Sequence, residues 1–335
     1  MSDTQKAHPT RRATLRTLST CLAAAALAFV PLASHAQSAF PNKVVRIIVP
    51  NPAGGASDVM ARLLAQQLGE MWKQPVVVEN RAGAAGNIGA SLVAKADADG
   101  HTLLLMDAAS LAILPSLYTG LNYDPLKDLA PVSIVAYSPH ILVVKNDLPV
   151  KDLKGLAAYG KANPGKLNFG QTTGTITHLA GVMLAQQLGF DWNYIGYKGG
   201  AQVLTDLAGG QIDAAMNSFL ATYPLVKSGN VKMLAVASAD RFSQIPDTPT
   251  IAETVPDFVT GSWQGLFATA GTPPEVVQKI HADIERITKS PETQKRLAEL
   301  GSERVDKSPK AFQEWMGQQA EYWGKVVRDN KISLQ

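Results

Sequence analysis

An α/β fold with a largely parallel sheet is predicted by two features of this 335-residue sequence. Apolar, strand-like runs alternate with helix patterns, beginning with Val44–Val49 and a helix pattern over residues 58–70. This alternation is typical of βα units, whose ligand sites lie at the carboxyl ends of the strands. Glycine turns such as Gly54-Gly55 separate strands from helices, so bare backbone N–H groups at helix starts are expected to attract an anion.

The elements follow one another in two sets. The first set continues with strand-like runs at Val76–Val78, Thr102–Met106, Ile134 and Ile141–Val144 and a helix pattern over residues 87–95. The second set has helix patterns over residues 151–162, 178–188, 201–208 and 220–227 and strand-like runs at 167–169, Trp192–Tyr197, Asp213–Met216 and Lys232–Ala237. Prolines 246, 249 and 256 then indicate a linker, and Trp263–Ala268 reads as one more strand.

The C-terminal 60 residues or so are predicted to be helical. Pro273-Pro274 opens one helix pattern, and Ser290-Pro291 and Ser308-Pro309 each place a capping serine before a proline at the first helical position. The last helix carries an apolar stripe, which predicts core packing, with an oligomer face as the alternative. The stripe consists of Phe312, Trp315, Met316, Trp323, Val326 and Val327.

Residues 1–36 are predicted to be a cleaved export signal. A basic segment with Arg11, Arg12 and Arg16 precedes an apolar run from Leu22 to Leu32, and a small-residue cleavage site ends at Ala36. The apolar run is too short to span a bilayer. The general secretory route is favoured, and the paired arginines leave the twin-arginine route open. An acylated start at Cys21 is rejected, because the apolar run continues past it.

Removing this segment changes the charge. It holds four of the 31 basic and one of the 28 acidic residues, so 27 of each remain and the net charge is zero. A nucleic-acid or membrane-surface partner therefore loses its main support. The single cysteine leaves with the segment, so the remaining chain of about 300 residues depends on its core, and its length favours two domains.

Catalytic and cofactor signatures are mostly absent from the sequence. The four histidines after residue 36 lack metal-ligand spacing, and there is neither a Walker A loop nor a G-x-S-x-G elbow. Gly83 to Gly89 reads G-x-x-G-x-x-G, which differs from the dinucleotide fingerprint. The sequence thus predicts no cofactor, no metal and no enzymatic activity.

Several polar residues near the glycine turns have structural as well as ligand-binding interpretations. Asp58 is favoured as a helix-start residue paired with Arg62. His178 is favoured as a local hydrogen-bonding residue at a helix start. For Lys198, beside a glycine turn, surface and cleft positions are equally favoured, whereas Asn217, just past a strand, is a better cleft candidate.

Three motifs, in order and spacing, closely resemble the Bug family of periplasmic receptors of tripartite tricarboxylate transporters, and the match covers essentially the whole chain after the signal. The motifs are Val49-Pro50-x-x-Ala53-Gly54-Gly55-x-x-Asp58, Glu79-Asn80-Arg81-x-Gly83-Ala84-x-Gly86-Asn87-Ile88-Gly89, and Tyr197-Lys198-Gly199-Gly200 with Leu204-Thr205-Asp206-Leu207.

The resemblance implies a two-lobed, type II-like periplasmic binding protein with Venus-flytrap architecture. Lobe one would comprise residues 38–138 plus 255–335, and lobe two residues 139–254, with the ligand cleft between them. The protein would be a periplasmic solute-binding receptor, monomeric, that captures a small carboxylate and passes it to integral-membrane transporter subunits.

The resemblance also implies the ligand contacts. One carboxylate would be held by backbone amides of Ala53-Gly54-Gly55 and Ala84-Ala85-Gly86, and the far end of the ligand would meet Thr173-Gly174-Thr175 with His178. The family usually has an aromatic residue after Pro50, where this chain has Asn51, which favours a more polar or larger acid. The remaining candidate contacts are Asp58, Asn87, Asp107, Lys198 and Asn217.

Two other classes stay open at this stage. One is an enzyme on a similar scaffold, which turnover of a bound acid would establish. The other is a sensory receptor that presents its liganded form to a membrane kinase, which neighbouring genes would distinguish from transport.

Export is expected to remove residues 1–36, because the basic, apolar and small-residue segments occur in signal order. The intact mass of protein purified from the periplasm should correspond to a chain that begins just after Ala36. A mass that includes Met1, or an acylated start at Cys21, would contradict the prediction.

Overall fold

The computed structural model describes residues 1–2, 40–242 and 244–333, and the folded unit begins at Phe40. The predicted signal segment with Cys21 lies outside the described residues. The strands are β1 (Val45–Val49), β2 (Val76–Asn80), β3 (Thr102–Asp107), β4 (Leu129–Val144), β5 (Asn168–Thr172), β6 (Asn193–Tyr197), β7 (Ala214–Ser218), β8 (Lys232–Val236) and β9 (Gly261–Thr269). The helices are α2 (Ala56–Trp72), α3 (Asn87–Ala94), α4 (Ala108–Leu117), α5 (Leu153–Ala162), α6 (Ile176–Leu188), α7 (Gly200–Ala208), α8 (Phe219–Lys227), α9 (Pro274–Lys289), α10 (Pro291–Glu299) and α11 (Pro309–Asp329), with a short 3-10 turn η1 (Ala84–Gly86) before α3.

The described strands form one mixed sheet in the order β2-β1-β3-β9-β4-β7-β5-β6, with β8 paired to β4. The α/β class is confirmed, but a largely parallel sheet is only part of the arrangement. Strands β1, β2 and β3 run parallel, as do β5, β6 and β7. Strand β9 is antiparallel to β3 and β4, and β4 is antiparallel to β7 and β8. Antiparallel neighbours need no crossover helix between them, so strand-helix alternation does not reveal them.

Strand β4 links the two halves of the sheet. Its first part, Leu129–Pro139, pairs with β9, and its last part, His140–Val144, pairs with β7. The two separate runs predicted at Ile134 and Ile141–Val144 are therefore one 16-residue strand. Together, β4 and β9 form the join between the parallel groups β1–β3 and β5–β7.

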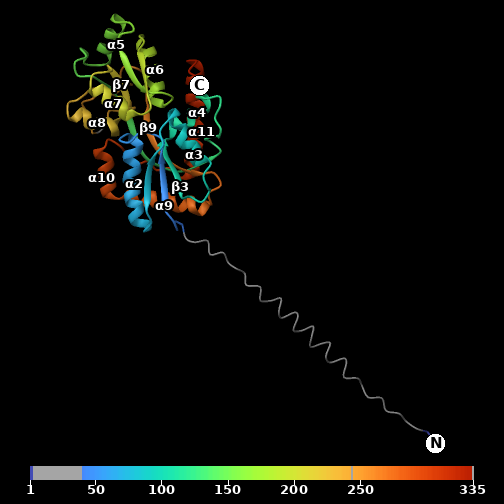
Figure 1. Ribbon diagram of the computed structural model, residues 1–335. Coiled ribbons are helices and arrows are strands. Elements are labelled where there is room, and N and C mark those ends of the chain that lie inside the picture. Colours follow the sequence, from blue (N-terminus) through green and yellow to red (C-terminus); the bar gives the residue numbers. More distant parts are fainter. Residues whose placement is uncertain (3–39, 243, 334–335) are drawn as a thin grey trace. The chain divides into compact units, whose positions relative to one another are not determined.

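Helices cover both faces of each half of the sheet. In Figure 1, α5, α6, α7 and α8 gather around β7, whereas α2, α3 and α9 lie near β3. The buried apolar side chains form separate clusters, two in each half. The stripe on α11 packs against α4 in one of these clusters, with Phe312 and Met316 almost fully buried, which confirms the core-packing interpretation.

Local sequence explains the helix starts. The hydroxyls of Ser290 and Ser308 accept hydrogen bonds from the amides of Thr293 and Ala311, as predicted for capping serines before proline. Helix α4 was not predicted because all but two of its residues are buried, so it shows no polar face, and it contains Pro115. Among the described residues, no helix is long and apolar enough to cross a bilayer.

Gly301 is expected to be essential for stability. Its φ is +64°, and a Cβ there would lie 1.5 Å from Cδ1 of Phe219, which is fully buried. Gly301→Ala should lower the free energy of unfolding by roughly 2–4 kcal/mol, combining left-handed strain with overpacking.

Gly165 is the matched control, because its φ is +69° and a Cβ would contact nothing within 4 Å. Gly165→Ala should cost only about 1 kcal/mol, the strain alone. Chemical denaturation of both variants measures the difference, and equal losses would show that packing against Phe219 is not limiting.

Candidate functional site

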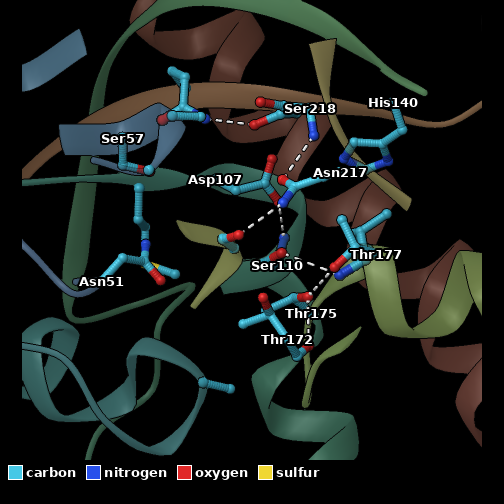
Figure 2. Close-up of a pocket in the computed structure, with 18 of the residues that line it drawn as sticks. Asn51, Ser57, Asp107, Ser110, His140, Thr172, Thr175, Thr177, Asn217 and Ser218 are labelled. Carbon is cyan, nitrogen blue, oxygen red and sulfur yellow. Dashed lines mark hydrogen bonds between the residues drawn. The ribbon is translucent and has the colours of Figure 1, made fainter. Parts of the chain in front are cut away.

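A cavity of about 80 Å³ lies at the carboxyl ends of several strands. Since one water needs about 10–15 Å³ of such space, the cavity has room for on the order of five to eight groups of that size. This is the scale of a small organic acid. Figure 2 shows the labelled polar side chains that surround it, from both halves of the sheet. The lining residues are Asn51, Pro52, Gly55, Ala56, Ser57, Ala85, Met106, Asp107, Ser110, His140, Thr172, Thr175, Ile176, Thr177, Gly200, Asn217, Ser218, Ser262 and Gln264.

Three helices begin at this cavity without a side-chain cap. The residues before the first turns of α2, α6 and α7 are Gly55, Thr175 and Gly199, and none of them caps its helix with a side-chain hydrogen bond. Residues of these first turns, including Ser57 and Thr177, line the cavity. Uncapped N–H groups and the positive ends of helix dipoles therefore face one small space, which suits an anion.

Two other helices that begin at the cavity are capped. The Asp107 carboxylate accepts a hydrogen bond from Ser110 N at the start of α4, and the Ser218 hydroxyl accepts one from Ala221 N at the start of α8. Their first-turn amides are thus partly satisfied within the protein. The starts of α2 and α7 lack a side-chain cap, and in α6 the Ile176 amide is bonded to the Ser110 hydroxyl, which leaves the later first-turn amides of α6 as candidates to bind an anion.

Asp107 is a structural centre of the cavity wall. Oδ1 accepts from Ser110 N and Oδ2 from Trp263 N, each at 2.7 Å, and the hydroxyls of Ser110 and Ser262 add two more bonds. Burial raises the pKa of its carboxyl, and these donors act in the opposite direction. The Ser110 hydroxyl also accepts from Ile176 N of α6 at 3.2 Å, so it joins the two halves of the sheet.

The two histidines near the cavity are neutral at pH 7. Burial lowers the pKa of His140 to about 3 and that of His178 to about 4. His140 lines the cavity, and its Nδ1 lies 3.0 Å from the Thr260 hydroxyl. His178 is not among the lining residues; its Nδ1 accepts from Gly174 N at 3.3 Å, as the local interpretation predicts.

The structure brings some of the predicted site residues to the cavity and places others behind it. Those that line it are Asn51, Gly55, Ala85, Asp107, Thr175 and Asn217. Those that are not among its lining residues are Ala53, Gly54, Asp58, Ala84, Gly86, Asn87, Thr173, Gly174, His178 and Lys198.

Asp58 and Gly54 support the first glycine loop. The Asp58 carboxylate accepts from Gly54 N and from Arg62, each at 2.9 Å, and also from Asn80. The predicted pairing of Asp58 with Arg62 is therefore confirmed. Because the Gly54 amide is already bonded to Asp58, it is not available to a ligand in this structure. The amides that remain available are those of Ala56 and Ser57 at the start of α2.

The second glycine loop behaves similarly. Gly86 has a φ of +94°, and its amide donates to Gly83 O at 2.9 Å, which leaves Ala85 on the cavity side.

In the second half of the sheet, Lys198 is exposed and its backbone amide donates to Gln202. Sequence alone could not choose between its surface and cleft positions, because glycine turns occur in both.

Sequence reasoning missed much of the polar lining. Two of these residues could have been identified from the sequence, because Ser57 follows the first glycine turn and Ser218 follows the candidate Asn217. Gln264 stands out as a polar residue within an otherwise apolar predicted strand. The lining residues that were not candidates include Ser57, Ser110, His140, Thr172, Thr177, Ser218, Ser262 and Gln264.

Neither a metal cluster nor a basic side chain is found at the site as far as the structure describes it. No group of histidine, cysteine, aspartate and glutamate among the described residues is suited to a metal ion. The described residues that line the cavity include neither lysine nor arginine. An anion in this cavity would therefore be attracted by backbone N–H groups and helix dipoles rather than by a basic side chain.

Fold and site together define a two-lobed periplasmic binding protein, and known proteins give the family. The model of the tripartite tricarboxylate transporter family receptor, TctC, matches residues 60–332. Protein BugT of Bordetella pertussis is 37% identical over 298 residues, which are 88% of this chain and 91% of BugT.

Two solved structures are similar over most of the chain. A Rhodopseudomonas palustris protein with adipate has a TM-score of 0.85 and 34% identity, over 88% of this chain and 100% of its own. MatC from the same organism, with bound malate, has a TM-score of 0.80 and 31% identity, over 86% and 100%. The chain belongs to the TctC family of tripartite tricarboxylate transporter receptors, and the predicted resemblance to Bug proteins is confirmed.

Acid is expected to destabilise the protein through His140. Its pKa is about 3 in the folded state against 6.5 ordinarily, so the unfolded chain takes up a proton first as the pH falls. Between pH 6.5 and pH 5 this one group should remove about 2 kcal/mol from the free energy of unfolding.

Urea denaturation at pH 7 and pH 5 checks this expectation. His140→Gln should lose less stability than the parent protein over that interval, whatever its stability at pH 7. Equal losses in the two proteins would show that His140 does not titrate as its burial requires.

Proposed function

We propose that this protein is a periplasmic receptor that captures a small carboxylate and delivers it to the membrane subunits of a tripartite tricarboxylate-type transporter. The observation that carries the proposal is the convergence of the uncapped starts of α2, α6 and α7 on one small cavity. Family membership and the adipate and malate held by two relatives support a carboxylate as the ligand.

The carboxylate is held by backbone amides and hydroxyl groups. Ala56 and Ser57 lie in the first turn of α2, and Thr177 lies in the first turn of α6. A carboxylate between these turns would accept hydrogen bonds from N–H groups that have no cap and would interact with both helix dipoles. Charge-assisted bonds of this kind are stronger than neutral ones, so no lysine or arginine is needed.

The two lobes comprise residues 38–138 plus 255–335 and residues 139–254. Support comes from β4, which changes its partner from β9 to β7 between Pro139 and His140. The segments near residues 138 and 255 then serve as hinges, and ligand binding closes the cleft because both lobes contribute contacts.

Binding without turnover is the activity we expect. The titratable residues lining the cavity within the described part of the chain are Asp107 and His140. Asp107 already accepts four hydrogen bonds, and His140 is bonded through Nδ1 to Thr260. The Thr260 hydroxyl beside His140 is not among the lining residues, and the hydroxyls beside Asp107 already bond within the protein, so we expect these groups to hold the cavity wall rather than to act as a base and nucleophile pair. We further propose that the exported protein acts as a monomer.

Ser57→Asp is expected to abolish carboxylate binding. The new carboxylate would occupy the start of α2 and repel the ligand, at a cost of about 3 kcal/mol or more, which is roughly a hundredfold in affinity. Calorimetric titration with adipate, malate and four- to six-carbon monocarboxylates, with and without a hydroxyl group, measures the effect on whichever acids bind the parent protein.

Ala311→Asp is the control, because it adds the same charge to the first turn of α11, which is not part of the cavity. It should bind normally. Thermal unfolding verifies that both variants fold. Undiminished binding by folded Ser57→Asp would show that the anion lies elsewhere, and failure of every acid to bind the parent protein would refute the proposed function.

Lobe closure provides an independent test. Small-angle scattering should give a smaller radius of gyration when a binding acid is added at saturation. Identical profiles with and without a bound acid would argue against a cleft that closes at the proposed hinges.

A further inference from the structure

The cavity has a second polar region, formed by Asp107, Ser262 and Gln264, which we call the acceptor wall. Asp107 at the end of β3 lies directly opposite Gln264 of β9, and Ser262 lies two residues before Gln264 on the same strand. Side chains at opposed and alternate positions share one face of a sheet. All three residues line the cavity.

Gln264 has an unused acceptor. Its side chain is 1% exposed, its Nε2 donates to Ser262 Oγ, and its Oε1 is buried with no hydrogen-bond partner in the protein. A buried carbonyl left without a donor is unfavourable, so such groups normally have a partner. Because Gln264 lines the cavity, the partner can come from a molecule bound there.

The hydrogen bonds of the acceptor wall fix the orientation of the Gln264 amide. Asp107 accepts from the backbone amides of Ser110 and Trp263 and from the hydroxyls of Ser110 and Ser262. The Ser262 hydroxyl proton is thus used by Asp107, so Ser262 Oγ must accept from Gln264 Nε2. Gln264 Oε1 is then the atom that remains free to accept a hydrogen bond from a ligand.

The charge around the acceptor wall disfavours a second carboxylate. The described residues that line the cavity include the Asp107 carboxyl group but no lysine or arginine to pair with a second carboxylate. His140, the other titratable residue of the lining, is neutral at pH 7. A second carboxylate here would meet the Asp107 carboxyl group and the Gln264 carbonyl oxygen with no cation beside them, whereas an O–H or N–H group could donate to Gln264 Oε1.

We propose that the acceptor wall binds a hydrogen-bond donor, so that the ligand is a small acid with one carboxylate at the helix starts and a hydroxyl, amide or ammonium group at its other end. This inference rests on the proposed function for the position of the carboxylate. It assigns Gln264 as a residue that determines which acids are accepted.

The test uses acids of four, five and six carbons that differ only at the far end. At each length, calorimetry compares a methyl, hydroxyl, carboxamide, ammonium or second carboxylate terminus. At the best length, at least one donor-bearing acid should bind tenfold or more tightly than both the methyl-terminated acid and the dicarboxylate. Comparison of hydroxyl, amide and ammonium identifies the donor.

Gln264→Leu should lower the affinity for the donor-bearing acid at least tenfold and leave the affinity for the methyl-terminated acid unchanged. Gln264→Glu keeps a hydrogen-bond acceptor and adds a negative charge. It should therefore still bind the donor-bearing acid, and its affinity for the dicarboxylate should be lower than that of the parent protein. Gln278→Leu on the exposed face of α9 is the matched control and should change nothing. Circular dichroism verifies folding of each variant.

Several outcomes would overturn the inference. Methyl-, donor- and carboxylate-terminated acids that bind within threefold of one another would mean that Gln264 Oε1 is served by something other than the ligand, such as a retained water. Tightest binding of a dicarboxylate, or an equal effect of Gln264→Leu on every acid, would refute the acceptor wall while the proposed function stands. If no acid binds the parent protein, the proposed function fails and this inference with it.

Discussion

Three helix starts that lack side-chain caps are the constraint on which the site depends. The first amides of a helix have no intrahelical acceptor, and most helices satisfy part of this need with a capping side chain. In this protein the residues before α2, α6 and α7 provide no such bond, whereas Asp107, Ser218, Ser290 and Ser308 do so at other helices. Helices α3 and α9 also begin without a side-chain cap, but among the uncapped starts those of α2, α6 and α7 have first-turn residues that line the cavity. We propose that an anion is the partner of these amides.

The sheet explains how the starts of α2 and α4 in one half can face those of α6, α7 and α8 in the other. Strands β4 and β9 run through the join between the parallel groups, so the carboxyl ends of β3, β5 and β7 come together around one space. The contact from Ile176 N to Ser110 Oγ then connects α6 with α4 across this space.

The sequence predicted the architecture well because its patterns are local. Periodicity identified most helices and strands, and serine before proline located two helix starts. The antiparallel strands β4 and β9 were missed as such because strand direction is a property of tertiary pairing. Helix α4 was missed because burial on almost all sides removes the amphipathic pattern.

The site was only partly predictable for a similar reason. Glycine turns indicated the correct loops, but they did not show which amides are already bonded within the protein. Asp58 takes the Gly54 amide, so the amides that remain available lie at Ala56 and Ser57. Gln264 and His140 enter the cavity through strand pairing, and no short motif reports that.

Backbone NMR of the ¹⁵N-labelled protein during titration with a binding acid tests the central claim most directly. If helix-start amides hold the carboxylate, the amide protons of Ala56, Ser57 and Thr177 should shift downfield on saturation, while those of Thr293 and Ala311 at capped helix starts should not. Unchanged resonances at Ala56, Ser57 and Thr177 in a saturated sample would contradict the account.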